Sequence, residues 1–210
     1  MNHSYPLMLD LTGRLVVIVG GGGVAARKAA GVMAAGATRV RVVAPELTGE
    51  MPKGVTHVAE AYDPRHLDGA GLVFAATDRP EVNAAVVRDA RAAGVLVNRA
   101  DSDEVDPGDF AVPAMLRRSS VTITVSSSGA APALSARMRD EVGRLLDDRW
   151  VRLADAAATL RPLILSRVSG ASRRREALQE LASDEAVQHA GNGHASLKDW
   201  LAARYPELAS

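Results

Sequence analysis

One stretch decides the fold of this 210-residue chain: residues 15–25 read LVVIVGGGGVA. The first five residues are apolar and mostly β-branched, which is typical of a parallel strand buried on both faces. Four glycines follow, and residues 24–35 then have helical spacing up to Gly36, an expected C-cap. A strand, a glycine turn and a helix in this order predict the first unit of a Rossmann-like sheet.

The glycine loop fits the pattern G-x-G-x-x-A and is expected to bind a dinucleotide. Gly20 permits a tight turn, Gly22 lets the backbone approach a pyrophosphate, and Ala25 is small enough for the helix to pack on the strand. An ordinary tight turn would not need four glycines, because their backbone entropy opposes folding. The predicted cofactor contacts are Gly20, Gly21, Gly22, Gly23, Val24 and Ala25.

The end of the second predicted strand, residues 39–43, bears on the choice of cofactor. Glu46 follows that strand and is positioned either to contact the ribose hydroxyls or to cap a turn. Arg27 and Arg41 are nearby, but neither is placed well for a 2′-phosphate. We therefore expect NAD rather than NADP, with Glu46 as the ribose contact.

Strands and helices alternate along the first half of the chain, with further strands predicted at 55–58, 71–76 and 95–97 and a helix from Pro80 to Gly94. Two more strands, 110–116 and 121–125, suggest a hairpin or a second sheet, and the chain is helical from Ala133 with breaks at Gly170 and at 191–193. The expected fold is α/β. A Rossmann-like doubly wound parallel sheet (1–109) precedes a small α+β dimerisation and substrate region (110–146) and a helical C-terminal part (147–210).

Bulk composition excludes several classes of function. Lys plus Arg and Asp plus Glu number 25 each, so there is no electrostatic case for nucleic acid or a membrane as partner. The chain has no cysteine, which excludes disulfides, thiolate metal sites and a Cys nucleophile. Residues 1–12 do not have the pattern of a signal peptide, and we expect a cytoplasmic protein.

Several motifs together resemble the precorrin-2 dehydrogenases, the siroheme-synthase-type enzymes of which some are also sirohydrochlorin ferrochelatases. The resemblance covers roughly residues 6–146 and depends on the order of the motifs. These are residues 9–14 and 19–28, Ala75-Ala76-Thr77-Asp78 with Asn83, Val97-Asn98 with Asp101, Phe110-Ala111-Val112-Pro113-Ala114, and 125–134 with Arg137.

The resemblance implies NAD-dependent oxidation of precorrin-2 to sirohydrochlorin, by a homodimer, and in some members insertion of ferrous iron. Since no methyltransferase domain follows, it implies a stand-alone enzyme. The family's essential Asp corresponds to Asp101, which also follows the fifth predicted strand at the edge where such sheets bind ligands. A carboxylate there can take the proton that must leave with the hydride. The segment after Asp101 is acidic and about two residues longer than the resemblance suggests, so Asp103 is the rival general base.

The remaining site residues follow from the same comparison. Thr77, Asp78 and Asn98 are further expected cofactor contacts, and the family's serine corresponds to Ser127, with Ser128 beside it. Because the substrate carries many carboxylates, Arg137 and Arg99 are expected to bind it. The histidines are scattered, so no tightly bound metal is expected, and a transient contact of iron with Asp101 is left open.

Two other functions remain as alternatives. One is a different NAD(P)-dependent oxidoreductase on the same scaffold, which would not account for Pro113 and the serine segment. The other is a dinucleotide-sensing regulatory domain, which would not need Asp101 or the downstream Arg residues. The fold alone does not distinguish between these functional hypotheses.

Overall fold

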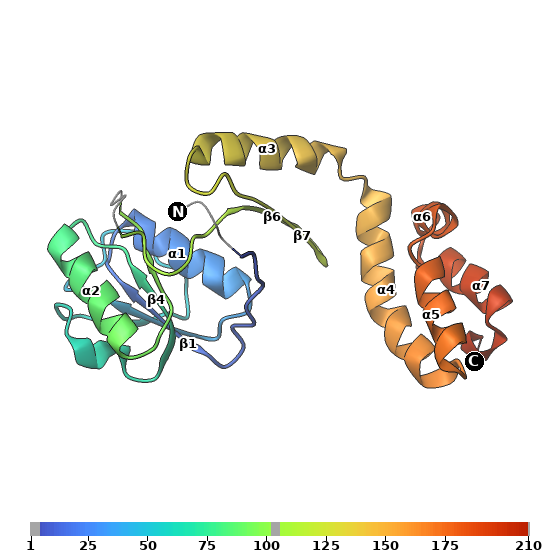
Figure 1. The fold of residues 1–210 in the computed structure, drawn as a ribbon, viewed down its shortest axis with the longest axis horizontal. Helices are drawn as coiled ribbons and strands as arrows, with labels where there is room; N and C mark the ends of the chain where they lie inside the picture. Colours follow the sequence, from blue (N-terminus) through green and yellow to red (C-terminus); the bar gives the residue numbers. More distant parts are fainter. Residues whose placement is uncertain (1–4, 102–105, 210) are drawn as a thin grey trace. The chain divides into compact units, whose positions relative to one another are not determined.

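The computed structural model describes residues 5–101 and 106–209. The described residues form two compact units, 5–112 and 113–209 (Figure 1). Among them, no helix is both long enough and apolar enough to cross a membrane.

The first unit contains a five-stranded parallel sheet in the order β3-β2-β1-β4-β5. Its strands are β1 (Leu15–Val19), β2 (Arg39–Val43), β3 (Thr56–Val58), β4 (Ala70–Ala75) and β5 (Val97–Arg99). The connections include the helices α1 (Gly23–Ala34) and α2 (Pro80–Ala92) and the short 3-10 helix η1 (Pro64–Leu67). The expected Rossmann-like fold is confirmed.

Successive side chains of β1 point to opposite faces of the sheet, and helices cover both faces. Every residue of β1 is buried. Val16 and Ile18 pack with Ala25 of α1, whereas Val17 packs with Val86 of α2 on the other face. A strand that is apolar on both sides requires such double cover.

The last strand of the sheet lies two residues later than the sequence predicts. Val97–Arg99 pairs with β4, so Asn98 lies within the strand and not after it. The chain returns along the outer edge of β5, where Asn98 forms a bridge with Gly108. The predicted strand at 110–116 also starts later, at Ala114, and Phe110 instead packs edge-on against Phe74 with ring centroids 5.5 Å apart.

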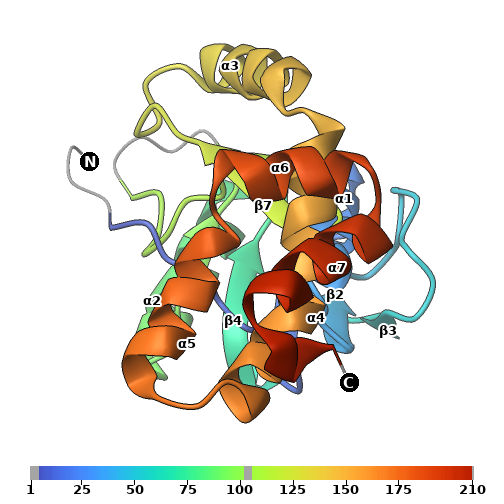
Figure 2. The ribbon, with the colours of Figure 1, turned by 90° about the vertical axis from the view of Figure 1, so that its right-hand side faces the viewer.

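The second unit begins with an antiparallel hairpin of β6 (Ala114–Arg118) and β7 (Val121–Val125), followed by α3 (Pro132–Leu145). The helices α4 (Asp148–Arg167), α5 (Ala171–Glu180), α6 (Asp184–Gly191) and α7 (His194–Arg204), with the 3-10 turn η2 (Pro206–Leu208), complete it. Figures 1 and 2 show α5, α6 and α7 alongside α4. They share a core around Leu160, Ile164 and Leu197.

The breaks between these helices are partly as predicted. Gly170 and Gly193 both have positive φ and precede α5 and α7, as their glycine character suggested. The break before α4 lies at the expected boundary between residues 146 and 147, whereas the break before α6 was not predicted. Polar side chains cap both helices. Asp147 accepts from the backbone N–H of Arg149 at the start of α4, and Ser183 accepts from that of Ala186 at the start of α6.

Candidate active site

The glycine loop joins β1 to α1 at the carboxyl edge of the sheet. Gly20 has φ 133°, and a Cβ there would lie 2.3 Å from the carbonyl oxygen of Ala76. A Cβ on Gly21 would lie 2.0 Å from the carbonyl oxygen of Glu46. The fold itself therefore requires glycine at these two positions, before any ligand is considered.

Gly22 is different, because the fold leaves space around it. It is the N-cap of α1 with ordinary extended backbone angles, and the nearest atom to a Cβ there is the Thr48 hydroxyl oxygen at 3.8 Å. No side chain caps the helix. The uncapped N–H groups at the start of α1, together with the helix dipole, form a site suited to an anion such as a pyrophosphate.

The loop after β2 packs against the glycine loop and borders the same site. Its residues Thr48 and Gly49 were not predicted to belong to the site. The backbone N–H groups of Thr48 and Gly49 both donate to the Gly21 carbonyl, at 2.9 and 3.0 Å. A Cβ on Gly49 would lie 2.8 Å from the backbone of Gly22. Glu46 is exposed in the same loop, where its carboxylate is available to a ribose. The only sequence signal for Gly49 was its place just after the second strand.

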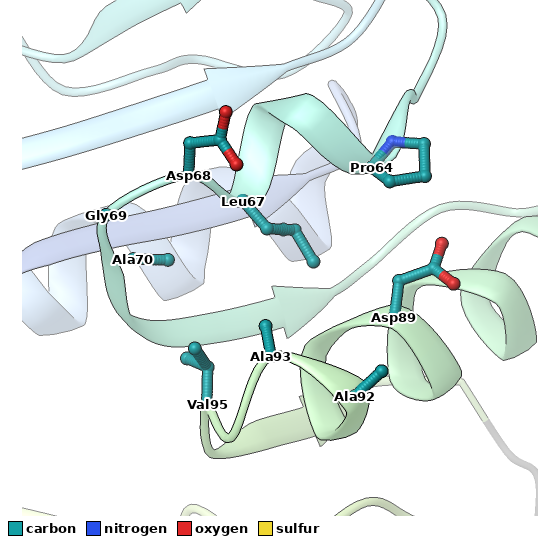
Figure 3. A pocket seen from close by; sticks show the side chains of 9 residues that line it. All are labelled: Pro64, Leu67, Asp68, Gly69, Ala70, Asp89, Ala92, Ala93 and Val95. Carbon is teal, nitrogen blue, oxygen red and sulfur yellow. The ribbon is translucent and has the colours of Figure 1, made fainter.

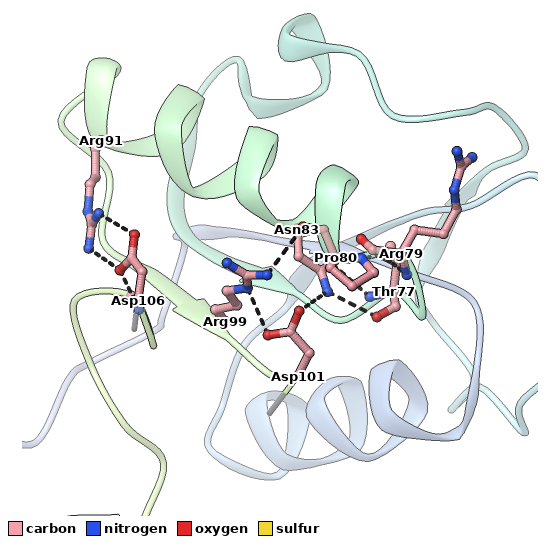
Figure 4. Close-up of polar contacts among 9 residues, drawn as sticks. Thr77, Arg79, Pro80, Asn83, Arg91, Arg99, Asp101 and Asp106 are labelled. Atoms are coloured by element: carbon pink, nitrogen blue, oxygen red, sulfur yellow. Dashed lines mark hydrogen bonds and ion pairs between the residues drawn. The ribbon is translucent and has the colours of Figure 1, made fainter. Parts of the chain in front are cut away.

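A buried polar network lies beyond the ends of β4 and β5 (Figure 4). Asn83, in the first turn of α2, is fully buried. Its amide nitrogen donates to Asp101 Oδ2 at 2.9 Å and to the Thr77 carbonyl at 3.0 Å, and its oxygen accepts from the Thr77 backbone and hydroxyl groups. Asn83 thus joins the predicted general base to the predicted cofactor contact Thr77. Asp78 adjoins Thr77 in the exposed turn after β4.

Arg99 holds the other oxygen of the Asp101 carboxylate. Its Nε lies 2.7 Å from Asp101 Oδ1, and a terminal nitrogen donates to the Pro80 carbonyl at 3.2 Å. The sequence predicts that Arg99 binds the carboxylates of the substrate. In the structure its side chain is only 5% exposed and its guanidinium is directed at the Asp101 carboxylate.

Asn98 has a buried oxygen without a hydrogen-bond partner among the described residues. Its amide nitrogen donates to the Phe110 carbonyl at 2.8 Å, which fixes the orientation of the amide. Buried polar atoms are usually paired, and an unpaired one needs an explanation. A ligand that brings an N–H group to this edge, such as a carboxamide, would satisfy Asn98 Oδ1.

Residues 106–109 are tied to α2. Arg91 donates to both carboxylate oxygens of Asp106 at 2.9 Å and to Asp109 at 2.8 Å. The Arg91 guanidinium lowers the pKa of Asp106 below its ordinary value. Asp103, the rival base, lies outside the described residues. No group of three or more metal-ligating side chains occurs within the described part of the chain.

The other predicted substrate residues belong to the second unit. The Ser127 hydroxyl accepts from the Ala131 backbone at 3.0 Å and from the Ser135 hydroxyl at 2.9 Å, so it shapes the turn before α3. Ser128 has φ 54° and its N–H donates to Ser126. Arg137 is exposed on α3.

The first unit also has a hollow of about 590 Å³ at the opposite edge of the sheet (Figure 3). It lies between the start of β4 at Ala70 and the end of α2 at Ala92, and Asp68 and Asp89 line it. None of the residues predicted to bind cofactor or substrate lines it. Ligands of parallel α/β sheets bind at the carboxyl edge, so we assign the active site there.

The chain resembles known proteins in both sequence and structure. Residues 7–114 match a family described as "Putative NAD(P)-binding". The siroheme synthase of Methylobacillus flagellatus is 39% identical over 178 residues, which cover 82% of this chain and 38% of that protein. The siroheme synthase of Photobacterium profundum is 39% identical over 176 residues, 81% of this chain and 37% of that protein.

The chain thus spans less than two-fifths of the length of these two relatives. A solved structure of SirC, a precorrin-2 dehydrogenase, matches with a TM-score of 0.75 and 26% identity. That match covers 93% of this chain and 98% of the other.

Proposed function

This chain belongs to the NAD(P)-binding family of precorrin-2 dehydrogenases and siroheme synthases, and from this premise we propose that it oxidises precorrin-2 to sirohydrochlorin with NAD. The observation that carries the proposal is the Asp101 carboxylate, held at the carboxyl edge of the sheet by Asn83 and Arg99. A binding module that only senses the dinucleotide would have no use for such a group.

The residues at this edge fit a nicotinamide dinucleotide. The open position at Gly22 and the uncapped start of α1 suit the pyrophosphate, and Glu46 suits the adenosine ribose. We propose that Thr77, Asp78 and the Asn98 oxygen, which has no partner among the described residues, contact the nicotinamide end of the cofactor. When bound, the cofactor accepts a hydride. The acidic Glu46 favours NAD over NADP, because a 2′-phosphate would be repelled.

Asp101 is the proposed general base. Loss of a hydride from precorrin-2 must be accompanied by loss of a proton, and an ionised carboxylate accepts that proton. Asn83 donates to one oxygen of the Asp101 carboxylate and Arg99 to the other, so both oxygens are held in position. Arg137, with Ser127 and Ser128, is proposed to bind the carboxylates of the substrate from the second unit.

Ferrous iron insertion is a second candidate activity, supported by the resemblance to siroheme synthases. It would require deprotonation of pyrrole nitrogens, a step for which the same Asp101 carboxylate is suited. Iron would enter as a substrate in transient contact with Asp101.

One experiment tests the function directly. Purified protein is mixed with precorrin-2 and NAD, and the absorbance of NADH and of sirohydrochlorin is followed. We expect both to rise in equal amounts, and more slowly with NADP in place of NAD. Absence of both products with either cofactor would refute the proposal. Adding Fe²⁺ after sirohydrochlorin has formed tests for ferrochelatase activity.

A further inference from the structure

We propose that Asn83 is a positioning residue for the dehydrogenation, which fixes the Asp101 carboxylate relative to the turn that follows β4. The inference rests on the proposed function, because it concerns the base of that reaction. Asn83 lies 18 residues from Asp101 in the sequence, and its side chain is fully buried between the ends of two neighbouring strands.

Asn83 uses its complete hydrogen-bonding capacity. A side-chain amide has two N–H donors and two acceptor lone pairs. Both donors are used, toward Asp101 Oδ2 and the Thr77 carbonyl, and the oxygen accepts from the Thr77 N–H and hydroxyl at 3.1 and 2.7 Å. A flipped amide would set its oxygen against Asp101 Oδ2 and the Thr77 carbonyl, acceptor to acceptor, and its N–H against the Thr77 N–H, donor to donor. The orientation of Asn83 is therefore unique.

Three of the four hydrogen bonds hold the turn at Thr77, and the fourth serves a different purpose. The bonds to Thr77 would be sufficient to keep the turn in place after β4 (Figure 4). The bond to Asp101 instead connects this turn to the end of β5. Because Thr77 adjoins the expected nicotinamide position, Asn83 sets the distance between the cofactor and the base.

Arg99 holds the carboxylate from its other side. Its Nε contacts Oδ1 and its terminal nitrogen is anchored on the Pro80 carbonyl, at the first residue of α2. Asn83 belongs to the same turn of the helix. The start of α2 therefore fixes the positions of both side chains that donate to Asp101. Fixing both oxygens restricts rotation of the carboxylate, and such orientation of a reacting group contributes to the rate.

The test compares Asn83→Asp, Asn83→Ser and the control Glu81→Gln in the full chain. Asn83→Asp keeps the size and the acceptors for Thr77 but has no N–H for Asp101, whereas Asn83→Ser shortens the side chain without adding charge. Glu81 is exposed on the same turn of α2 and pairs with Arg79. Each protein is assayed for kcat with precorrin-2, for KM and Kd of NAD, and for Tm.

We expect both Asn83 variants to lose about 10- to 100-fold in kcat, as a misplaced reacting group does. The Kd of NAD should stay within about threefold, because the glycine loop is untouched, and Glu81→Gln should behave as wild type. A folded Asn83 variant with wild-type kcat would overturn the inference. A parallel loss of Tm, NAD affinity and kcat, or failure of both variants to fold, would do so too, since a structural role would then be sufficient. Wild-type protein that does not convert precorrin-2 would instead refute the proposed function.

Discussion

Gly143 of α3 packs directly on Leu116 of β6: a Cβ on Gly143 would lie 2.7 Å from a methyl carbon of Leu116. The absence of a side chain at 143 lets the helix lie close to the hairpin. Even so, the hairpin and α3 contain no buried apolar side chain, and Ser135 is their only buried residue. This part of the second unit therefore does not bury a hydrophobic core within one chain.

The opposite side of α3 carries an apolar stripe. Leu134, Met138, Val142 and Leu145 are between 40% and 82% exposed. At 3.6 residues per turn, they lie within roughly 80° of one another, and Gly143 faces the other way. We propose that a second copy of this chain covers the stripe, which makes the protein a homodimer.

The first prediction tests this surface with Met138→Glu. The variant should weaken the dimer more than about tenfold, because burial of a Met side chain contributes about 1.5–3 kcal/mol and a buried charge adds a penalty. Light scattering over a dilution series measures the effect. Asp140→Lys is the control, since Asp140 lies off the stripe and should leave the dimer intact. Wild-type protein that is monomeric at micromolar concentration would contradict the proposal.

The second prediction concerns Gly22→Asp. The variant should fold with an unchanged or higher Tm, because Asp is a good N-cap and complements the helix dipole. It should nevertheless abolish NAD binding, since its carboxylate would occupy the proposed pyrophosphate site and repel it. Calorimetric titration with NAD measures the loss. Gly31→Asp, which places the same charge in open space on α1, should bind NAD normally. Normal binding by folded Gly22→Asp would contradict the assignment.

The third prediction is that the stabilisation provided by the ion pair of Arg91 and Asp106 depends on pH. The hydrogen bonds from Arg91 lower the pKa of Asp106 in the folded protein from 3.8, so the pair stabilises the fold above that pH. The stabilisation is lost as the pH falls through the lowered pKa. Arg91→Met should therefore have a lower Tm than wild type at pH 7, and the difference should vanish in strong acid. A difference in Tm that is independent of pH would exclude the ion pair as its cause.

Local patterns explain why the start of the chain could be predicted. The strand at residues 15–19 and the expected N-terminal turn of α1 are confirmed, because β-branched runs and glycines act over a few neighbouring residues. The limits of β5 could not be predicted in the same way. They depend on pairing with β4 and on the returning segment at Gly108, both distant in sequence.

The site was predicted in outline but not in its contacts. Asp101 follows from its place after a strand, since the edge of a parallel sheet is set by topology. The hydrogen-bond partners of Asp101 could not be predicted, because no sequence periodicity relates Asn83 to Asp101. Arg99 illustrates the limit. The sequence shows a cation two residues before Asp101, but only the structure shows that it is buried and directed at the Asp101 carboxylate.

The last prediction tests the base itself. Asp101→Ala should bind NAD normally, because the glycine loop lies apart from it, and should lose precorrin-2 oxidation by about 10²-fold or more, as loss of a general base does. Any ferrochelatase activity should fall with it if one carboxylate serves both steps. Rates are measured from NADH absorbance at saturating NAD.

Asp103→Ala is the matched control, because Asp103 is the nearest other carboxylate in the sequence. If Asp103→Ala is inactive and Asp101→Ala is active, the assignment of the base to Asp101 is wrong, but a carboxylate still acts as the base. If both single variants and the double variant keep full activity, the general-base proposal fails. Asp101→Ala also removes one acceptor of buried Arg99, so its Tm must be measured. Asp101→Asn, which keeps an acceptor for Arg99 but is no base, should be as inactive as Asp101→Ala and closer to wild type in Tm.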